Sequence, residues 1–217
     1  MTLCVALLGG SFDPVHEGHV ALAAMFANLL APDELRIIPA GSPWQKSGLR
    51  ARADDRVAML ELAFGQARFP EVTLDLQEVE RAAPSYTIDT LRNVRAELGP
   101  EASVVFLMGA DQLQQLDTWR DWQSLFGLAH IGVAARPGYA LADAALPASV
   151  ATEFQQRLGT LAQLRNQPSG HAYLAQALDV DISATQVRAA LQRGEQANSL
   201  ISPVVLDYIQ QHNLYKT

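Results

Sequence analysis

The sequence predicts an α/β fold, in which a doubly wound parallel sheet carries helices on both faces. Short apolar runs alternate along the chain with stretches of helical periodicity, and the first of these form a strand–turn–helix–strand unit. Parallel neighbours need such a crossover, and strands covered on both faces are continuously apolar. No repeat and no linker rich in Gly, Ser or Pro divides the chain, so we expect residues 1–217 to form a single domain.

The first unit occupies the first forty or so residues. Leu3 to Leu8 is a short apolar run closed by Gly9 and Gly10, as expected of a buried strand. We interpret Asp13-Pro14 as the cap and first turn of the helix that follows. The apolar stripe of that helix comprises Val20, Ala23, Ala24, Ala27 and Leu30, widened by Leu22, Phe26 and Leu29. Leu35 to Pro39 is the second strand and completes the crossover.

The later elements continue the alternation. We predict helices over residues 56–64 and 88–98, strands over 72–76, 104–108 and 131–134, a helix within 153–164, one or two strands within 171–181, and a final helical stretch from about Thr185. Residues 138–170 show no clear pattern beyond that one helix. The fold class is therefore Rossmann-like, and ligands of such sheets bind beyond the carboxyl ends of the strands.

Composition narrows the class of protein. Lys and Arg total 16 against 23 Asp and Glu, and the net charge of −7 argues against a broad nucleic-acid-binding face. The only cysteine, Cys4, cannot form an intramolecular disulfide and is expected to be a buried, inert thiol. No apolar run is long enough for a membrane span, and the N-terminal residues lack the basic region of a signal peptide. We expect a cytoplasmic enzyme or small-ligand binder that does not act on nucleic acid or membranes.

The turn after the first strand has features of an anion site. Gly9 and Gly10 carry no Cβ to keep backbone amides away from a phosphate, although their spacing is neither GxGxxG nor a Walker loop. His16 and His19, three apart, are expected on one side of the first helical turns, near the positive helix end. A surface pair or a zinc pair would have the same spacing. Because no Cys or further His clusters nearby, we assign no metal ligands.

A second candidate anion site lies near the end of the chain. Ser183-Ala184-Thr185-Gln186 has the form of a capping box that opens a helix carrying Arg188. A well-capped helix with a solvent-facing arginine is the structural alternative. The position of the box after a strand-like run makes phosphate binding an equal competitor.

Several segments resemble a known family. Residues 9–19, GGSFDPVHEGH, are similar to the GSFDPxHxGH signature of the adenylyltransferase branch of the HxGH nucleotidyltransferases. Residues 182–188, ISATQVR, resemble the ISxTxxR motif that closes this superfamily. Between them, PSYTIDTL at 84–91, Gly109-Ala110-Asp111 and Thr118-Trp119 are similar to bacterial nicotinate-nucleotide adenylyltransferases. The likeness extends over essentially the whole chain.

The resemblance implies transfer of the adenylyl group of ATP to nicotinate mononucleotide, a step of NAD biosynthesis, by direct in-line attack without a covalent intermediate. It implies an ATP site made of Gly9, Gly10, Ser11, Phe12, His16, His19, Gly109, Asp111, Ile182, Ser183, Thr185 and Arg188. Of these, His16, His19 and Arg188 are the implied catalytic residues at the reacting phosphates. The implied nicotinate mononucleotide site comprises Lys46, Tyr86, Thr87, Trp119, Arg120 and Arg136, with Trp119 stacked on the pyridine ring. Mg²⁺ is expected to be carried on the ATP phosphates.

Two departures from the family pattern concern the nicotinate site. The family often has Pro-Pro-His-Lys where this chain has Pro43-Trp44-Gln45-Lys46, so only Lys46 is carried over. Arg120 stands where an aromatic residue frequently follows the stacking tryptophan.

Other interpretations stay open. The acceptor could be nicotinamide mononucleotide or another phosphate monoester such as phosphopantetheine, or the chain could be a catalytically idle nucleotide sensor. Trp119 and Trp122, three apart on an expected helix, could serve packing alone. We interpret Glu80-Arg81 and Asp54-Asp55-Arg56 as solvated or structural charges.

Overall fold

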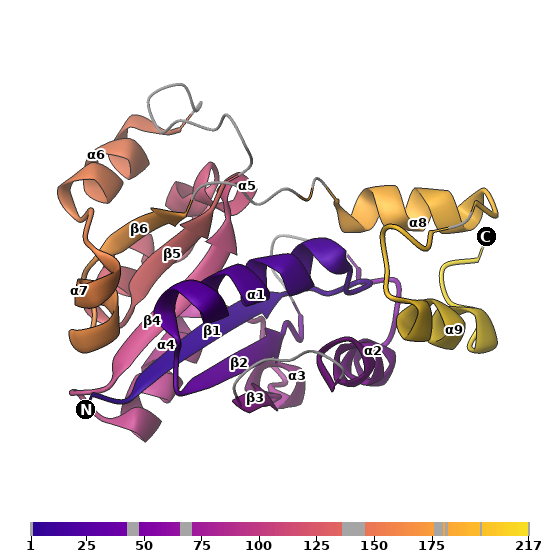
Figure 1. Ribbon diagram of the computed structural model, residues 1–217, viewed down its shortest axis with the longest axis horizontal. Coiled ribbons are helices and arrows are strands. Elements are labelled where there is room, and N and C mark those ends of the chain that lie inside the picture. Colours follow the sequence, from indigo (N-terminus) through magenta and orange to yellow (C-terminus); the bar gives the residue numbers. More distant parts are fainter. Residues whose placement is uncertain are drawn as a thin grey trace.

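The strands form an open parallel sheet with a reversal of strand order near its middle. The computed structural model describes residues 2–42, 48–65, 71–135, 146–175, 180, 182–195 and 197–216. Within these residues one sheet has the order β3-β2-β1-β4-β5-β6, with every neighbouring pair parallel (Figure 1). Its strands are β1 (Cys4–Gly10), β2 (Glu34–Pro39), β3 (Glu71–Leu74), β4 (Ser103–Gly109), β5 (His130–Ala134) and β6 (Ala172–Ala175). The predicted Rossmann-like fold class is confirmed, with its switch point between β1 and β4.

Helices cover both faces of the sheet. They are α1 (Glu17–Leu30), α2 (Ala53–Gly65), α3 (Gln77–Glu80), α4 (Thr87–Leu98), α5 (Ala110–Leu113), α6 (Ala148–Gln156), α7 (Leu161–Asn166), α8 (Ala184–Gln192) and α9 (Pro203–Gln211), with the 3₁₀ turns η1 (Leu116–Thr118) and η2 (Trp122–Gly127). Among the described helices, none is both long and apolar enough to cross a membrane.

The alternation of side chains along β1 divides the core in two. Ala6 and Leu8 lie in a buried cluster with residues of α1, α2, α7, α8 and α9. Val5 and Leu7 lie in a second cluster with residues of α4, α5, α6 and the 3₁₀ turns. Burial on both faces explains why the strand is apolar at every position, as the sequence predicted. Cys4 is the first residue of β1 and is fully buried, which confirms both its predicted place in the first strand and its predicted burial.

The start of α1 corrects one interpretation. The helix begins at Glu17 with His16 as its N-cap, not at Asp13-Pro14. Asp13 cannot act as the cap because its carboxylate accepts hydrogen bonds from the backbone N–H groups of Arg50 and Ala51. A local signal for a helix start is overridden here by a tertiary contact.

The buried face of α1 is narrower than the predicted stripe. Leu22 and Phe26 are buried as expected, together with Ala23 and Leu30. Leu29, which we placed on the same stripe, is 39% exposed. The predicted stripe is therefore widened by Leu22 and Phe26 but not by Leu29.

Two other helix predictions need correction. The helix expected within residues 153–164 is divided into α6 and α7, because Thr160 begins a new helix with a capping box to Gln163. The same T-x-x-Q pattern is visible in the sequence. The final helical stretch is likewise two helices, since α8 ends at Gln192 and Pro203 opens α9.

His130, at the start of β5, makes the stability of the fold depend on pH. Its ring is fully buried, with Nε2 2.8 Å from the carbonyl oxygen of Gln167, while Nδ1 accepts from the backbone N–H of His171 at 3.0 Å. The carbonyl can only accept, so the neutral ring carries its proton on Nε2. Burial lowers the pKa of His130 to about 4 from the ordinary value of 6.5.

We therefore expect stability to fall as the solution is acidified. Between pH 6.5 and about 4 the unfolded chain binds a proton at His130 that the folded chain does not, so unfolding becomes easier as pH falls. The free energy of unfolding is therefore expected to be about 3 kcal/mol higher above pH 6.5, where the ring is neutral in both states, than below pH 4. NMR of the His130 ring should show no titration between pH 8 and 5.5. Titration near 6.5 would contradict the expectation.

Candidate active site

The loop between β1 and α1 is anchored by a buried aromatic side chain. A Cβ on Gly10 would lie 3.0 to 3.3 Å from atoms of the Phe12 ring, so any side chain at this position would crowd the ring. Phe12 is fully buried and has φ of 45°, a left-handed conformation that costs a bulky residue on the order of 1–3 kcal/mol. With its ring in the core, Phe12 can contact a nucleotide only through its backbone.

His16 and His19 lie together at the beginning of α1. Their rings are stacked, with centroids 3.7 Å apart and planes inclined by 29°. The backbone N–H of His16 donates to Nδ1 of His19 at 3.2 Å. Because a backbone N–H can only donate, the proton of a neutral His19 ring lies on Nε2. His19 is thus held in the tautomer that can donate Nε2–H to a phosphate oxygen.

The second motif, residues 182–188, forms the start of α8, with Ser183 as the predicted N-cap. Ser183 Oγ accepts from the backbone N–H of Gln186 at 3.2 Å, and Gln186 Oε1 accepts from the backbone N–H of Ser183 at 2.7 Å. The predicted capping box is confirmed. A helix start with backbone N–H groups directed outward attracts anions.

The structure brings the two motifs into contact. Arg188 Nη1 donates to the carbonyl oxygen of Asp13 at 2.6 Å, and Arg188 Nη2 donates to Thr185 Oγ1 at 3.3 Å. A Cβ on Gly18 would lie only 3.4 Å from the carbonyl oxygen of Ile182. The beginnings of α1 and α8 are therefore neighbours, as Figure 1 also shows. Arg188 is not simply a solvent-facing arginine.

Gly109 and Asp111 lie at the switch point. Gly109 ends β4, the strand next to β1, and a Cβ there would lie 2.6 Å from Asp111 Oδ1. Asp111 itself is exposed on α5. The two expected ATP residues thus stand at the same sheet edge as Gly10.

The described part of the expected nicotinate site lies around the start of α4. Tyr86 is the N-cap of α4 and Thr87 its first residue. The guanidinium carbon of Arg120 lies 5.0 Å from the centroid of the Tyr86 ring, and Arg120 Nη1 is 3.8 Å from Asp89 Oδ2. A planar guanidinium therefore covers an aromatic ring at the position where the family frequently has an aromatic residue.

Trp119 packs against the sheet and keeps a polar atom unsatisfied. Its ring meets the Phe106 ring edge-on at 6.2 Å, and both Trp119 and Trp122 pack against the second core cluster, as the packing interpretation expected. They do not share a helix, since Trp119 follows η1 and Trp122 begins η2. The indole Nε1 of Trp119 is buried without a hydrogen-bond partner in the described structure, which costs about 1–3 kcal/mol. Lys46 and Arg136 lie outside the described residues.

Sequence reasoning missed a buried polar junction under the first loop. Asp13, 4% exposed, accepts at Oδ2 from the backbone N–H of Arg50 at 2.8 Å. Its Oδ1 accepts from the backbone N–H of Ala51 at 3.0 Å and from the Tyr215 hydroxyl at 2.7 Å. A network of this kind fixes one arrangement of the segments it joins.

Arg56 belongs to the same junction. It is 1% exposed, and its Nη1 donates to the carbonyl oxygen of Ser11 at 2.9 Å. Burial lowers the pKa of Arg56, while the charge of Asp13 acts in the opposite direction. The signal was present in the sequence, because Arg56 stands three and four positions before Met59 and Leu60 and so shares the buried face of α2.

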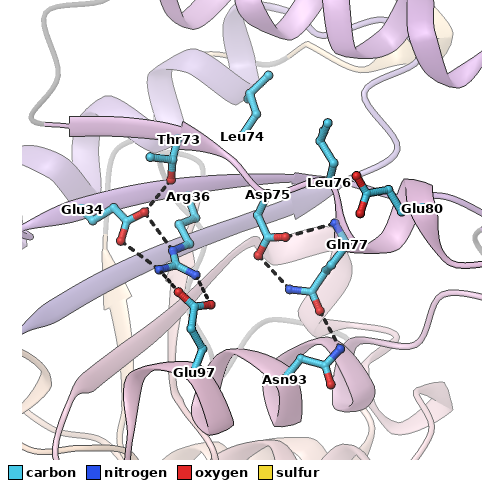
Figure 2. Close-up of a pocket in the computed structure, with 10 residues that line it drawn as sticks. All are labelled: Glu34, Arg36, Thr73, Leu74, Asp75, Leu76, Gln77, Glu80, Asn93 and Glu97. Atoms are coloured by element: carbon cyan, nitrogen blue, oxygen red, sulfur yellow. Dashed lines mark hydrogen bonds and ion pairs between the residues drawn. The ribbon is translucent and has the colours of Figure 1, made fainter.

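A cavity of about 580 Å³ lies elsewhere, beside the first half of β2 (Figure 2). Four carboxylates line it, those of Glu34, Asp75, Glu80 and Glu97. Its one arginine, Arg36, is held by Glu34 at 2.9 Å and by Glu97 at 2.7 Å. None of the residues expected to bind nucleotides lines this cavity, and its charge disfavours a polyanion.

Comparison with known proteins indicates the family to which the chain belongs. A family model described as cytidylyltransferase-like matches residues 7–190. A probable nicotinate-nucleotide adenylyltransferase of Herminiimonas arsenicoxydans is 60% identical over 217 residues, covering 100% of this chain and 99% of the relative. Another from Laribacter hongkongensis is 46% identical, covering 99% of this chain and 96% of the relative.

Solved structures share the fold. The nicotinic acid mononucleotide adenylyltransferase of Plasmodium falciparum, complexed with NaAD, superposes with a TM-score of 0.74 at 20% identity, covering 98% of this chain and 97% of that chain. The same enzyme complexed with APC gives a TM-score of 0.73 at 19% identity, over 98% and 96% of the two chains. On the family model and the full-length relatives together, this chain belongs to the cytidylyltransferase-like family and, within it, to the nicotinate-nucleotide adenylyltransferases.

Proposed function

We propose that this nucleotidyltransferase moves the adenylyl group of ATP to nicotinate mononucleotide, giving nicotinate adenine dinucleotide and pyrophosphate. The observation that carries the proposal is the hydrogen bond from Arg188 to the Asp13 carbonyl, which joins the two motifs proposed to bind phosphate. The names of the full-length relatives support the same reaction. We also propose that residues 1–217 act as one domain, because both motifs serve one site.

Adenylyl transfer requires alignment of the two substrates more than activation of the attacking phosphate. The 5′-phosphate of nicotinate mononucleotide is largely ionised at pH 7, since the second pKa of a phosphate monoester is near 6. Its oxygen attacks the α-phosphorus of ATP, a P–O bond forms, and the opposite P–O bond breaks with its electron pair leaving on pyrophosphate. Holding the two reactants in line contributes roughly 7–11 kcal/mol. No covalent intermediate and no general base are required.

The ATP site is proposed to surround the reacting phosphates with donors. His19 would donate from Nε2, the nitrogen that carries the proton when Nδ1 accepts from His16. Arg188, placed by its bonds to Asp13 and Thr185, has further N–H groups for the leaving phosphates. Donors fixed before the reaction stabilise the developing charge without reorganisation.

The nicotinate site is proposed to combine stacking with charge. Trp119 would stack on the pyridine ring, and the backbone N–H of Thr87, at the start of α4, would donate to the carboxylate. Arg120, over the Tyr86 ring, supplies a planar cationic wall where an aromatic is frequent. Lys46 and Arg136 stay proposed phosphate contacts outside the described residues.

A divalent cation carried on the ATP phosphates fits this site, and we propose Mg²⁺. Among the described residues no three His, Cys, Asp or Glu side chains form a metal-binding group. Mg²⁺ in such sites is held mainly by substrate phosphates and water, so it does not need a protein cage. Bound there, the ion would neutralise charge on the triphosphate. The expected cytoplasmic location and the expected lack of action on nucleic acid or membranes stay predictions.

Pyrophosphate release with Mg-ATP tests the proposal. We expect fast release with nicotinate mononucleotide and much slower release with nicotinamide mononucleotide or phosphopantetheine at equal concentration, because cationic and N–H groups favour a carboxylate. Equal or faster release with either competitor would reassign the substrate. Measurable ATP binding without release from any acceptor would favour a nucleotide sensor.

A further inference from the structure

We propose that Tyr215 is a positioning residue for adenylyl transfer, through which the C-terminal tail fastens the ATP-binding loop. This inference rests on the proposed function. The Tyr215 hydroxyl donates to Asp13 Oδ1 at 2.7 Å, across a sequence separation of 202 residues. Tyr215 is only 6% exposed, so the contact is an interior one although it lies near the end of the chain.

Asp13 is the point at which four segments of the site meet. Its carboxylate accepts hydrogen bonds from the Tyr215 hydroxyl and from the backbone N–H groups of Arg50 and Ala51. Its backbone carbonyl oxygen accepts a hydrogen bond from the guanidinium of Arg188 on α8. The loop before α1, the chain that leads into α2, the tail and the second motif thus share one residue. Any rotation of Asp13 is expected to move the arginine that we place at the leaving phosphates.

The tail takes an unusual path to reach Asp13. Asn213 and Tyr215 both have positive φ, 54° and 63°, although neither is glycine. Such conformations persist only where the surroundings hold them. Burial, and next the hydrogen bond to Asp13, raise the pKa of the Tyr215 hydroxyl far above its ordinary value of 10, so it remains a donor. The tail is therefore bent to present one hydroxyl to one carboxylate.

Tyr208 provides a matched control. Its hydroxyl also donates to a carboxylate, Asp55 Oδ1 on α2, at 3.1 Å. Replacing either tyrosine with Phe removes one hydroxyl–carboxylate bond from the C-terminal region. Only Tyr215 is bonded to the ATP-binding loop, so the comparison separates positioning from general support of the fold.

The experiment compares Tyr215→Phe and Tyr208→Phe with the unaltered chain at a temperature well below their melting points. For Tyr215→Phe we expect kcat to fall about tenfold and the Kd for Mg-ATP, measured by calorimetry, to rise about fivefold, since small displacements of reacting groups have large effects on rate. The KM for nicotinate mononucleotide should stay within about twofold. Tyr208→Phe should leave kcat and Kd unchanged within about twofold.

The outcomes are separable. Unchanged kcat and Kd in Tyr215→Phe, or equal losses in both variants, would overturn the positioning role. If the unaltered chain binds ATP but transfers no adenylyl group, the proposed function fails, while the Kd comparison still decides the role of Tyr215. If Tyr215→Phe does not fold, hydrogen exchange of the unaltered chain decides: residues 11–15 and 213–216 should gain protection together when Mg-ATP binds. Protection of the loop without the tail would overturn the inference.

Discussion

His19→Ala is expected to lower kcat by at least about a hundredfold while changing the affinity for ATP only modestly. The reason is the fixed direction of the ring: Nδ1 accepts from the His16 backbone, so Nε2–H is directed as a donor before substrate arrives. A donor that meets charge developing on the α-phosphate stabilises the transition state more than the bound substrate. Such a loss appears in kcat and in kcat/KM together.

Steady-state kinetics and calorimetric ATP binding check this expectation. His212→Ala is a suitable control, because His212 is exposed beyond α9 and stacks only on Tyr208 among the described residues. His16→Ala is less informative, since His16 is 7% exposed and is also the N-cap of α1. Weakened ATP binding with unchanged kcat in His19→Ala would assign His19 to docking alone.

Asp13→Asn is expected to destabilise the fold by about 3–5 kcal/mol. The substitution keeps the size of the side chain but removes the charge near the buried guanidinium of Arg56, and an amide nitrogen cannot accept the N–H of Arg50. Removing one partner from a buried charge network has costs of this size, because the remaining charge stays desolvated.

The midpoint and slope of urea unfolding measure this effect. Asp207→Asn, at an exposed position of α9, serves as the control and should stay within about 0.5 kcal/mol of the unaltered chain. A free energy of unfolding for Asp13→Asn within about 1 kcal/mol of the unaltered chain would contradict a stabilising role for this junction. In that case the site loop would be held by its own packing, chiefly by Phe12.

Local signals predicted the strands and the edge at which the site lies. The run from Leu3 to Leu8 determines a buried strand, because apolar continuity is a local property, whereas the two glycines that we placed in the turn are the last residues of β1 and pair with β2. The capping box at Ser183 was equally visible and is confirmed. The rule that ligands bind beyond parallel strands then placed the candidate residues at one edge of the sheet.

Local signals failed where a distant segment competed with them. Asp13-Pro14 has the form of a helix start, yet the partners of Asp13 are Arg50, Ala51 and Tyr215. We predicted one helix within residues 153–164 where the structure has two, although the capping box that begins the second helix at Thr160 is visible in the sequence. The first error is tertiary in origin, whereas the second was an unused local signal.

The sequence by itself determined the α/β alternation, the two histidines at the beginning of a helix and the capped helix that carries Arg188. Each depends on the periodicity or conformational preference of a few neighbouring residues. Only the tertiary structure decided that Asp13 joins the two ends of the chain, that Arg56 is buried beneath the loop and that Arg120 covers Tyr86. The partners of a buried polar side chain are whichever groups packing brings within about 3 Å, and sequence spacing does not encode that distance.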